Sequence, residues 1–166
     1  YSTKIDVVDL KTSEIVNSID LEAGIDRAIL SPNGKYLAAE DFTNIKLYNI
    51  ETKTLLKSVR SYIFWNESIN FSPDGKYIVS GGNDSIENVV KVWEVPSYRL
   101  VMQMNGHVNA INSVCYSPDG KYIVSGSCDG YIKVWDASNG AEVRSLTGEK
   151  QSMISSVNFS PDGKYL

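Results

Sequence analysis

The chain has 166 residues, with 42% hydrophobic and 10% aromatic side chains, 20 acidic and 16 basic residues, and a formal net charge of −4. No stretch approaches the roughly 18 apolar residues of a membrane helix, and the ample aliphatic and aromatic content excludes intrinsic disorder. The acidic balance gives no general attraction to nucleic acid, so we expect neither a membrane nor a nucleic-acid partner.

A seven-residue turn sequence recurs four times along the chain. It reads Ser-Pro-Asn-Gly-Lys-Tyr-Leu at residues 31–37, with close variants at 72–78, 117–123 and 160–166, spaced 41, 45 and 43 residues apart. A strand-like element keeps step with it at residues 5–9, 45–49, 90–94 and 132–136. In each turn proline fixes one φ angle, Asp or Asn can bond its own backbone, and glycine can take a positive φ. These features indicate a tandem repeat that is built on tight turns.

Each repeat contains four runs of strand-forming residues. In the clearest copy they are residues 111–116, 121–125, 131–136 and 141–146. No run of a dozen residues has apolar positions at helical spacing, and a four-stranded unit cannot bury both of its faces alone. We therefore predict an all-β chain, a β-propeller of four-stranded antiparallel blades, because radial stacking protects the sheet edges. An open β-sandwich is the competing interpretation.

We expect about four blades' worth of sheet, as part of a larger ring. The expected units are a half blade at 1–20, blades at 21–60, 61–104 and 105–147, and a half blade at 148–166. Leu166 aligns with Ile123, and Tyr1 aligns near Cys128, so the two half blades are complementary. A ring completed by a second copy of the chain is the alternative. In both cases the open blade edges favour self-association.

One repeat carries three signature motifs together. They are Gly-His at 106–107, Ser-Gly-Ser-Cys-Asp-Gly at 125–130 and Trp-Asp at 135–136. In these motifs and their spacing the chain resembles the WD-repeat family of β-propellers. The resemblance implies a buried structural tetrad, in which Asp129 accepts a hydrogen bond from His107. His107 in turn contacts Ser125, and Ser125 reaches the indole N–H of Trp135.

Ser125, His107 and Asp129 also have the residue types of a hydrolase triad. A serine nucleophile needs an exposed hydroxyl on a strained turn, such as the Gly-x-Ser-x-Gly elbow. Ser125 lies instead within an alternating strand, and no such elbow surrounds it. We therefore predict the structural tetrad and no catalytic residues, so the protein is not expected to be an enzyme.

The other repeats keep fewer of these residues. The repeat that contains Trp93 retains Ser80 and Asp84, which together form a partial tetrad. The lysines at the matching strand position of three repeats, Lys46, Lys91 and Lys133, are expected to be solvated.

The repeat around Tyr48 is the most degraded. Ala39 replaces the serine of the tetrad, Phe42 or Thr43 stands where the aspartate is expected, and the histidine position falls near Leu21. We expect this blade to rely on apolar packing.

The sequence offers no cofactor or metal site. One histidine and two cysteines cannot supply four zinc ligands, and no Gly-rich segment is followed by the lysine and helix of a phosphate loop. The hairpin places Cys115 and Cys128 too far apart for a disulfide. We therefore expect two free thiols and an intracellular location, cytoplasmic or nuclear.

The loops between strands four and one, and between strands two and three, form one end of such a propeller, termed here the top face. The most unusual of them spans residues 62–68 and contains Phe64 and Trp65. We assign Phe64, Trp65, Ala110 and Cys128 to a partner-binding surface, although the aromatics can instead fill the space of a missing histidine. The resulting hypothesis is a non-catalytic protein–protein interaction scaffold. The alternative is a non-catalytic propeller subunit of an enzyme or of a nucleic-acid or chromatin complex.

Overall fold

The computed structural model describes residues 3–22, 24–41, 44–60, 65–83, 88–147 and 152–166, which form strands and no helix. The strands are β1 (Thr3–Val8), β2 (Ile15–Leu21), β3 (Arg27–Leu30), β4 (Tyr36–Glu40), β5 (Asn44–Asn49), β6 (Thr54–Arg60), β7 (Trp65–Phe71), β8 (Tyr77–Asn83), β9 (Asn88–Glu94), β10 (Leu100–His107), β11 (Ile111–Tyr116), β12 (Tyr122–Ser127), β13 (Tyr131–Asp136) and β14 (Glu142–Thr147). The all-β class that the sequence predicts is confirmed.

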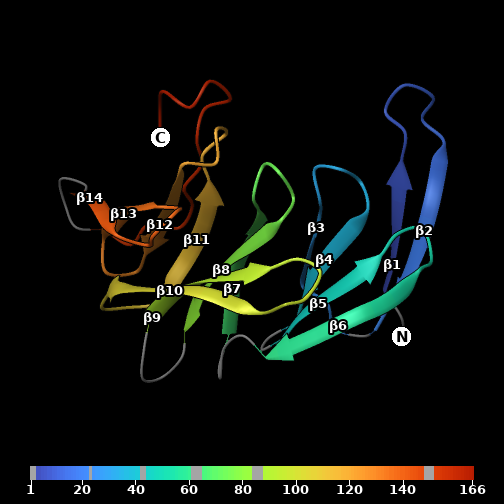
Figure 1. The fold of residues 1–166 in the computed structure, drawn as a ribbon, viewed down its shortest axis with the longest axis horizontal. Coiled ribbons are helices and arrows are strands. Elements are labelled where there is room, and N and C mark those ends of the chain that lie inside the picture. The colour runs from blue at the N-terminus through green and yellow to red at the C-terminus, as the bar shows by residue number, and fades with distance from the viewer. Residues whose placement is uncertain (1–2, 23, 42–43, 61–64, 84–87, 148–151) are drawn as a thin grey trace.

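The strands form one two-stranded sheet, β1–β2, and three four-stranded sheets, β3–β6, β7–β10 and β11–β14. Within each sheet, strands that follow one another in the chain are antiparallel neighbours. Figure 1 shows the sheets side by side, with the two ends of the chain at opposite ends of the row. Each four-stranded sheet is a propeller blade, and the exact blade boundaries at 21–60, 61–104 and 105–147 stay predictions.

The repeated turn joins the first and second strands of each blade. In the copy at residues 117–122, Ser117 Oγ donates to Asp119 Oδ1 at 2.6 Å and accepts from the Tyr122 N–H at 2.9 Å. Gly120 takes a φ of 72°, which lets its N–H donate to the Ser117 carbonyl at 2.9 Å. The same side-chain contacts recur at residues 31–36, 72–77 and 160–165. The turn is thus fixed by local hydrogen bonds before any blade packs on another.

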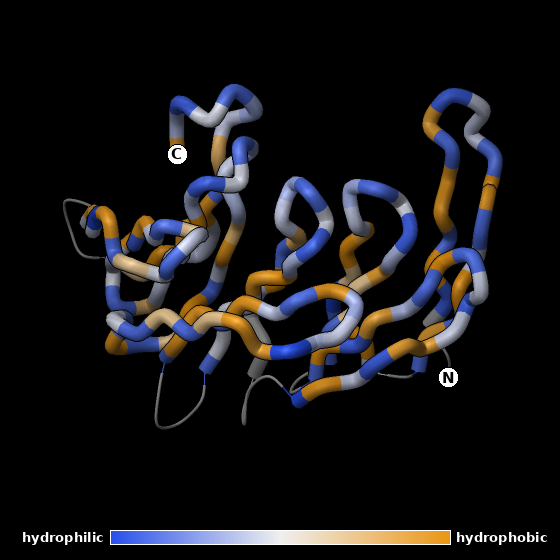
Figure 2. The backbone as a smooth tube through the Cα atoms, in the orientation of Figure 1, coloured by the Kyte–Doolittle hydropathy of each residue, from blue (hydrophilic) through white to orange (hydrophobic). Residues whose placement is uncertain are grey.

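The apolar cores lie between blades and not within them. One cluster joins Leu47 of β5 to Ile69 and Trp93 of the next blade. Another joins Val79 of β8 to Trp135 of β13. Figure 2 shows that apolar residues recur along the strands, while the turns are mainly hydrophilic. Each sheet therefore buries its faces against its neighbours, as a stacked repeat requires.

Two glycines leave space for side chains of the next blade, so neighbouring blades can approach closely. We call each such space a glycine socket. A Cβ added to Gly81 of β8 would lie 2.6 Å from Ile111 Cγ2 and 2.7 Å from Val114 Cγ1 of the next blade. Next to this contact, Ser68 Oγ accepts the Val114 N–H at 3.1 Å. The absence of a side chain at position 81 is what admits the β11 side chains.

The same socket recurs one blade later. At Gly126 of β12, an added Cβ would lie 2.5 Å from Ile154 Cγ2 and 2.9 Å from Val157 Cγ1. Ser113 Oγ accepts the Val157 N–H at 3.1 Å, as Ser68 does in the preceding blade. The strand register shows the equivalence, because Ser68 is opposite Gly81 and Ser113 is opposite Gly126.

The β3–β6 blade has an ion pair in place of the glycine socket. Its equivalent opposed pair is Arg27 and Glu40, and Arg27 Nε lies 3.5 Å from Glu40 Oε1. Glu40 is buried, with 3% of its surface exposed. The junction between this blade and the next is therefore built differently from the two junctions that follow.

The expected half blade at 148–166 is not seen as a strand pair. Residues 152–166 carry no strand in the part of the chain that the structure describes, although Ser160 to Tyr165 form the repeated turn. At the other end, β1 and β2 pair from Thr3↔Leu21 to Val8↔Ile15. Completion of the two half blades stays a prediction.

The close contact at Gly81 predicts that a larger residue at this position destabilises the protein. Gly81→Ala is expected to lower the free energy of unfolding by about 1–3 kcal/mol, because the added methyl overlaps Ile111 and Val114. Urea unfolding would measure the loss. In a double-mutant cycle with Ile111→Ala, the two losses should add up to more than the loss in the double variant, since the truncation makes room for the methyl. Strict additivity would show that the two residues do not compete for space.

Candidate functional site

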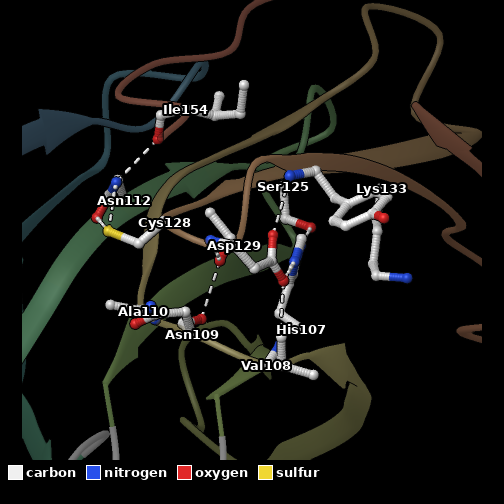
Figure 3. Close-up of polar contacts among 12 residues, drawn as sticks. His107, Val108, Asn109, Ala110, Asn112, Ser125, Cys128, Asp129, Lys133 and Ile154 are labelled. Atoms are coloured by element: carbon white, nitrogen blue, oxygen red, sulfur yellow. Dashed lines mark hydrogen bonds and ion pairs between the residues drawn. The ribbon is translucent and has the colours of Figure 1, made fainter. Parts of the chain in front are cut away.

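The only histidine of the chain is the centre of a hydrogen-bond network that joins the end of β10 to the β11–β14 blade. Trp135 Nε1–H donates to Ser125 Oγ at 2.8 Å. Ser125 Oγ lies 2.8 Å from His107 Nε2, and His107 Nδ1 lies 2.8 Å from Asp129 Oδ2. Figure 3 shows His107 between Ser125 and Asp129. The structure thus brings together all four residues that the sequence assigns to the tetrad.

Four separate elements supply these side chains. His107 ends β10, Ser125 lies in β12, Asp129 stands in the turn before β13, and Trp135 lies in β13. The Asp129 turn forms because Gly130 takes a φ of 84° and its N–H donates to the Ser127 carbonyl at 3.2 Å. The network therefore ties the last strand of one blade to the middle strands of the next.

Asp129 is held as a carboxylate. Burial acts to raise its pKa, but hydrogen bonds from His107, Tyr131 and Val108 outweigh burial and keep the pKa below its ordinary value. The Val108 N–H donates to Oδ2 at 3.0 Å, and the Tyr131 N–H donates to Oδ1 at 2.9 Å. Backbone donors of this kind favour the charged form of a carboxyl group. The same bonds fix the direction in which the chain leaves His107.

His107 is neutral in the folded protein. Burial lowers the pKa of His107, and the opposing effect of Asp129 does not restore it. Neutral imidazole also satisfies every partner: Nδ1–H donates to Asp129, and Nε2 accepts from the Ser125 hydroxyl, which accepts in turn from Trp135. The His107 side chain is 0% exposed and that of Asp129 is 3% exposed. We infer one complete chain of donors and acceptors, which runs from the end of β10 into the β11–β14 blade.

A substrate cannot reach the Ser125 hydroxyl, so Ser125 is not placed to act as a nucleophile. Ser125 is 0% exposed, and its oxygen is already bonded to both His107 and Trp135. A catalytic serine needs a substrate carbonyl beside its oxygen and donors for the developing oxyanion. The network is instead of the kind that fixes a fold by satisfying buried polar groups. Its contribution to stability stays a prediction.

The β7–β10 blade keeps part of the network. Trp93 Nε1–H donates to Ser80 Oγ at 2.9 Å, which repeats the Trp135–Ser125 bond. Asp84, the third predicted member, lies outside the described residues. The Trp93 ring also packs against Tyr98, with ring centroids 6.5 Å apart.

The β3–β6 blade packs through apolar residues and also contains an ion triad, which the expectation of apolar packing did not include. Lys46 Nζ lies 2.8 Å from Glu22 Oε2 and 3.0 Å from Asp41 Oδ2, and the lysine side chain is only 8% exposed. Burial alone would lower the pKa of Lys46, but the two carboxylates outweigh it and raise that pKa. An ion triad therefore takes the place of the histidine network.

The positions named from the sequence do not take part in this triad. Leu21 and Ala39 are buried in an apolar cluster with Tyr48, and Phe42 and Thr43 lie outside the described residues. The expectation that the repeated lysines are solvated also fails at Lys133, whose side chain is 12% exposed and whose Nζ lies 2.8 Å from Glu142. The signal in the sequence that would have predicted the triad is an acidic residue in each of the two loops beside Lys46, Glu22 after β2 and Asp41 after β4.

The residues assigned to a partner surface are only partly brought together. The Cys128 N–H donates to the Ala110 carbonyl at 2.9 Å, so these two residues are neighbours. Trp65 is described by its place at the start of β7, opposite Asn83, and Phe64 lies outside the described residues. Sequence reasoning missed Val108, which follows His107 and is 83% exposed.

Both cysteines are free thiols. Burial raises the pKa of Cys115 to about 11, which keeps it protonated. Cys128 is half-buried, and Asn112 Nδ2 donates to its sulfur at 3.2 Å (Figure 3). Across the described ranges no three His, Cys, Asp or Glu side chains are placed to hold a metal ion, and no helix there could cross a membrane.

Comparison with known proteins matches a family model and curated proteins that include the two below. The family model described as "WD domain, G-beta repeat" matches residues 63–94, 98–136 and 140–166. COMPASS component SWD3 of Saccharomyces cerevisiae is 27% identical over 129 residues, which cover 77% of this chain and 40% of that protein. Small ribosomal subunit protein RACK1 of Schizosaccharomyces pombe is 34% identical over 96 residues, covering 52% of this chain and 30% of that protein. The chain thus spans less than half the length of these relatives.

The neutral His107 predicts a pH dependence of stability. The unfolded chain binds a proton at His107 below a pH of about 6.5, whereas the folded chain resists it. The free energy of unfolding should therefore fall as the pH is lowered from 7.5 to 5.5, by at most about 1.4 kcal/mol per pH unit. Urea unfolding at three pH values would measure this slope.

His107→Gln is the control, because it removes the chain's one histidine. This variant should be less stable than the native chain at pH 7.5, and it should lose most of the slope between pH 7.5 and 5.5. A native stability that rises on acidification would show instead that His107 is protonated beside Asp129.

The Lys46 triad predicts a selective loss of stability. Lys46→Met is expected to cost about 1–3 kcal/mol, because it leaves Asp41 half-buried without its cation. The cost stays below that of a fully buried pair, since the Glu22 side chain is 63% exposed. Lys57→Met, at an exposed position of β6 in the same sheet, should change stability by less than about 0.5 kcal/mol. Equal effects of the two substitutions would disprove the role of the triad.

Proposed function

Because the chain belongs to the WD40 repeat family, we propose that it is a non-catalytic protein-interaction scaffold that binds partners through its top face. The family match covers parts of the β7–β10 and β11–β14 blades and the residues after them. Both relatives are named as parts of larger assemblies, COMPASS and the small ribosomal subunit. These names support a role in protein assembly for this chain as well.

The observation that carries the proposal is the contrast between His107 and the residue after it. The polar atoms of His107 are fully used inside the blade, whereas Val108 is 83% exposed. Asp129 fixes this change of direction, because its Oδ2 accepts from both the His107 ring and the Val108 N–H. The buried polar groups thus fix the conformation of an exposed loop, and binding residues are often found on loops that a rigid scaffold positions.

The proposed surface combines Val108 and Ala110 of this loop with Cys128 of the neighbouring turn. Phe64 and Trp65 of the preceding blade stay in the proposal as aromatic anchors, because large aromatic side chains dominate the energetics of many interfaces. We further propose that the four sheets belong to a larger ring, which fits the share of the relatives that the chain spans. The two free thiols support an intracellular location.

The test is a charge placed on the top face. Val108→Glu is expected to abolish binding of a partner while it changes the melting temperature by less than about 2 °C, because surface substitutions barely affect stability. Partners captured from a lysate of the source cells would be identified by mass spectrometry and purified. The affinity of each would then be measured with the native chain and the variant.

Val143→Glu is the matched control, since Val143 is a 53% exposed valine on β14, away from the top-face loops. It should leave binding unchanged. If Val143→Glu weakens binding and Val108→Glu does not, the partner binds the outer edge and the top-face assignment is wrong. A captured enzyme or nucleic-acid complex would make the chain a non-catalytic subunit of that assembly.

A further inference from the structure

A groove of about 560 Å³ opens between the β7–β10 and β11–β14 blades. It lies where the β7–β8 and β11–β12 turns approach the β13–β14 turn. In an antiparallel sheet these turns are at the opposite end from the β8–β9 and β10–β11 loops of the top face. Figure 1 shows the β3–β4 and β7–β8 turns together on one side of the row of sheets. The groove is therefore independent of the surface proposed above.

The floor of the groove is apolar. Val101 and Met102 of β10 line one side, and Tyr116 of β11 and Ala137 line the other. All four are half-buried and pack against the apolar cluster between the two blades. Its volume falls within the range of sites that hold drug-sized ligands, so it has room for one or two side chains of a partner.

Two carboxylates from neighbouring repeats stand at the groove. Asp74 comes from the β7–β8 turn, and Asp119 comes from the β11–β12 turn. In each of them one oxygen serves the turn, while Oδ2 lies 3.4 Å from an exposed lysine, Lys76 or Lys121. Exposed ion pairs of this kind contribute little, so a cation from a partner can replace either lysine at low cost.

The carboxylates are the charges left for a ligand. Arg99 also lines the groove, but its guanidinium donates to both carboxylate oxygens of Glu94, at 3.3 Å each. The pKa of Asp74 lies below its ordinary value, because hydrogen bonds from Ser72 and Lys76 outweigh the effect of burial. Hydrogen bonds from Ser117 and Lys121 likewise lower the pKa of Asp119. Both groups are therefore negative at neutral pH.

A second groove of the same volume, about 560 Å³, lies between the β1–β2 sheet and the β3–β6 blade. Its lining includes Lys35 and Glu51, and the turn beside it contains Asn33 in place of the aspartate. Of these two grooves, only the one between the β7–β10 and β11–β14 blades combines an apolar floor with two aspartates.

We propose that the groove binds a peptide segment of a protein partner, with an apolar side chain on Val101, Met102 and Tyr116 and a lysine or arginine beside Asp74 and Asp119. Charge complementarity selects this occupant over an acidic or neutral peptide. The apolar floor selects it over a free cation, which would lose hydration without gaining contact.

The chain itself supplies the conservative substitution for a test. In the turn at residues 31–36, Asn33 Oδ1 accepts from Ser31 Oγ at 2.8 Å and from the Lys35 N–H at 3.0 Å. These are the bonds that Asp74 and Asp119 accept in their own turns. Asp→Asn therefore removes the charge and keeps the turn.

The probe is a capped pentapeptide with one phenylalanine followed by two lysines, compared with peptides that carry two glutamines or two glutamates instead. Fluorescence anisotropy should give the tightest binding for the lysine peptide, and added salt should weaken it. The double variant Asp74→Asn and Asp119→Asn should bind the lysine peptide about two- to thirty-fold more weakly.

Asp162→Asn is the matched control, because this aspartate has the same turn contacts and does not line the groove. It should leave the affinity for the lysine peptide unchanged. Ala137→Leu, which fills the groove, should weaken binding of the lysine peptide while thermal unfolding shows a native melting temperature. If Ala137→Leu unfolds the chain, the proposal is tested by comparing the affinity of the double variant with that of Asp162→Asn.

The proposal is overturned if the three peptides bind equally, if none binds, or if Asp162→Asn weakens binding as much as the double variant. It is also overturned if the double variant abolishes self-association of the chain and leaves the lysine peptide's affinity unchanged, since the groove would then hold a second copy. The Val108 experiment on the top face is separate, so failure of one proposal does not decide the other.

Discussion

Burial of each sheet between its neighbours is the constraint on which the structure depends. A four-stranded sheet has two faces and no apolar core of its own, so side chains such as Leu47 and Val79 are dry only because another blade covers them. The glycine sockets allow the close approach, and the hydroxyls of Ser68 and Ser113 accept backbone N–H groups at the junctions. The tetrad fixes the loop end of one blade against the last strand of the previous blade. Loops and grooves are thus properties of pairs of blades.

The turns and strands could be predicted from sequence because their causes are local. Proline, Asx and glycine determine the turn within seven residues, and the alternating strands follow on either side. The partners of His107 were also predictable, because the complete set of four side chains stands in one repeat at the spacing of a known family. The two backbone donors to Asp129 became clear only in the structure, where the N–H groups of Val108 and Tyr131 donate to its carboxylate.

The environment of Lys46 could not be predicted in this way. Whether a lysine on a strand is solvated depends on what the loops beside it contain, and one of the two loops beside Lys46 comes from a neighbouring sheet. Glu22 follows β2 and Asp41 follows β4, so the triad exists only after two sheets have packed.

The glycine sockets bear on how such an array can lengthen. The β11–β14 blade carries Ile111 and Val114 on its first strand and the socket at Gly126 on its second. A duplicated copy of this unit would therefore meet its parent through a contact that already exists. The β3–β6 blade offers no such contact, because Glu40 occupies the equivalent position. A copy of the β11–β14 blade would thus stack on the original through the glycine contact that the structure already shows, whereas a copy of the β3–β6 blade would need a different contact.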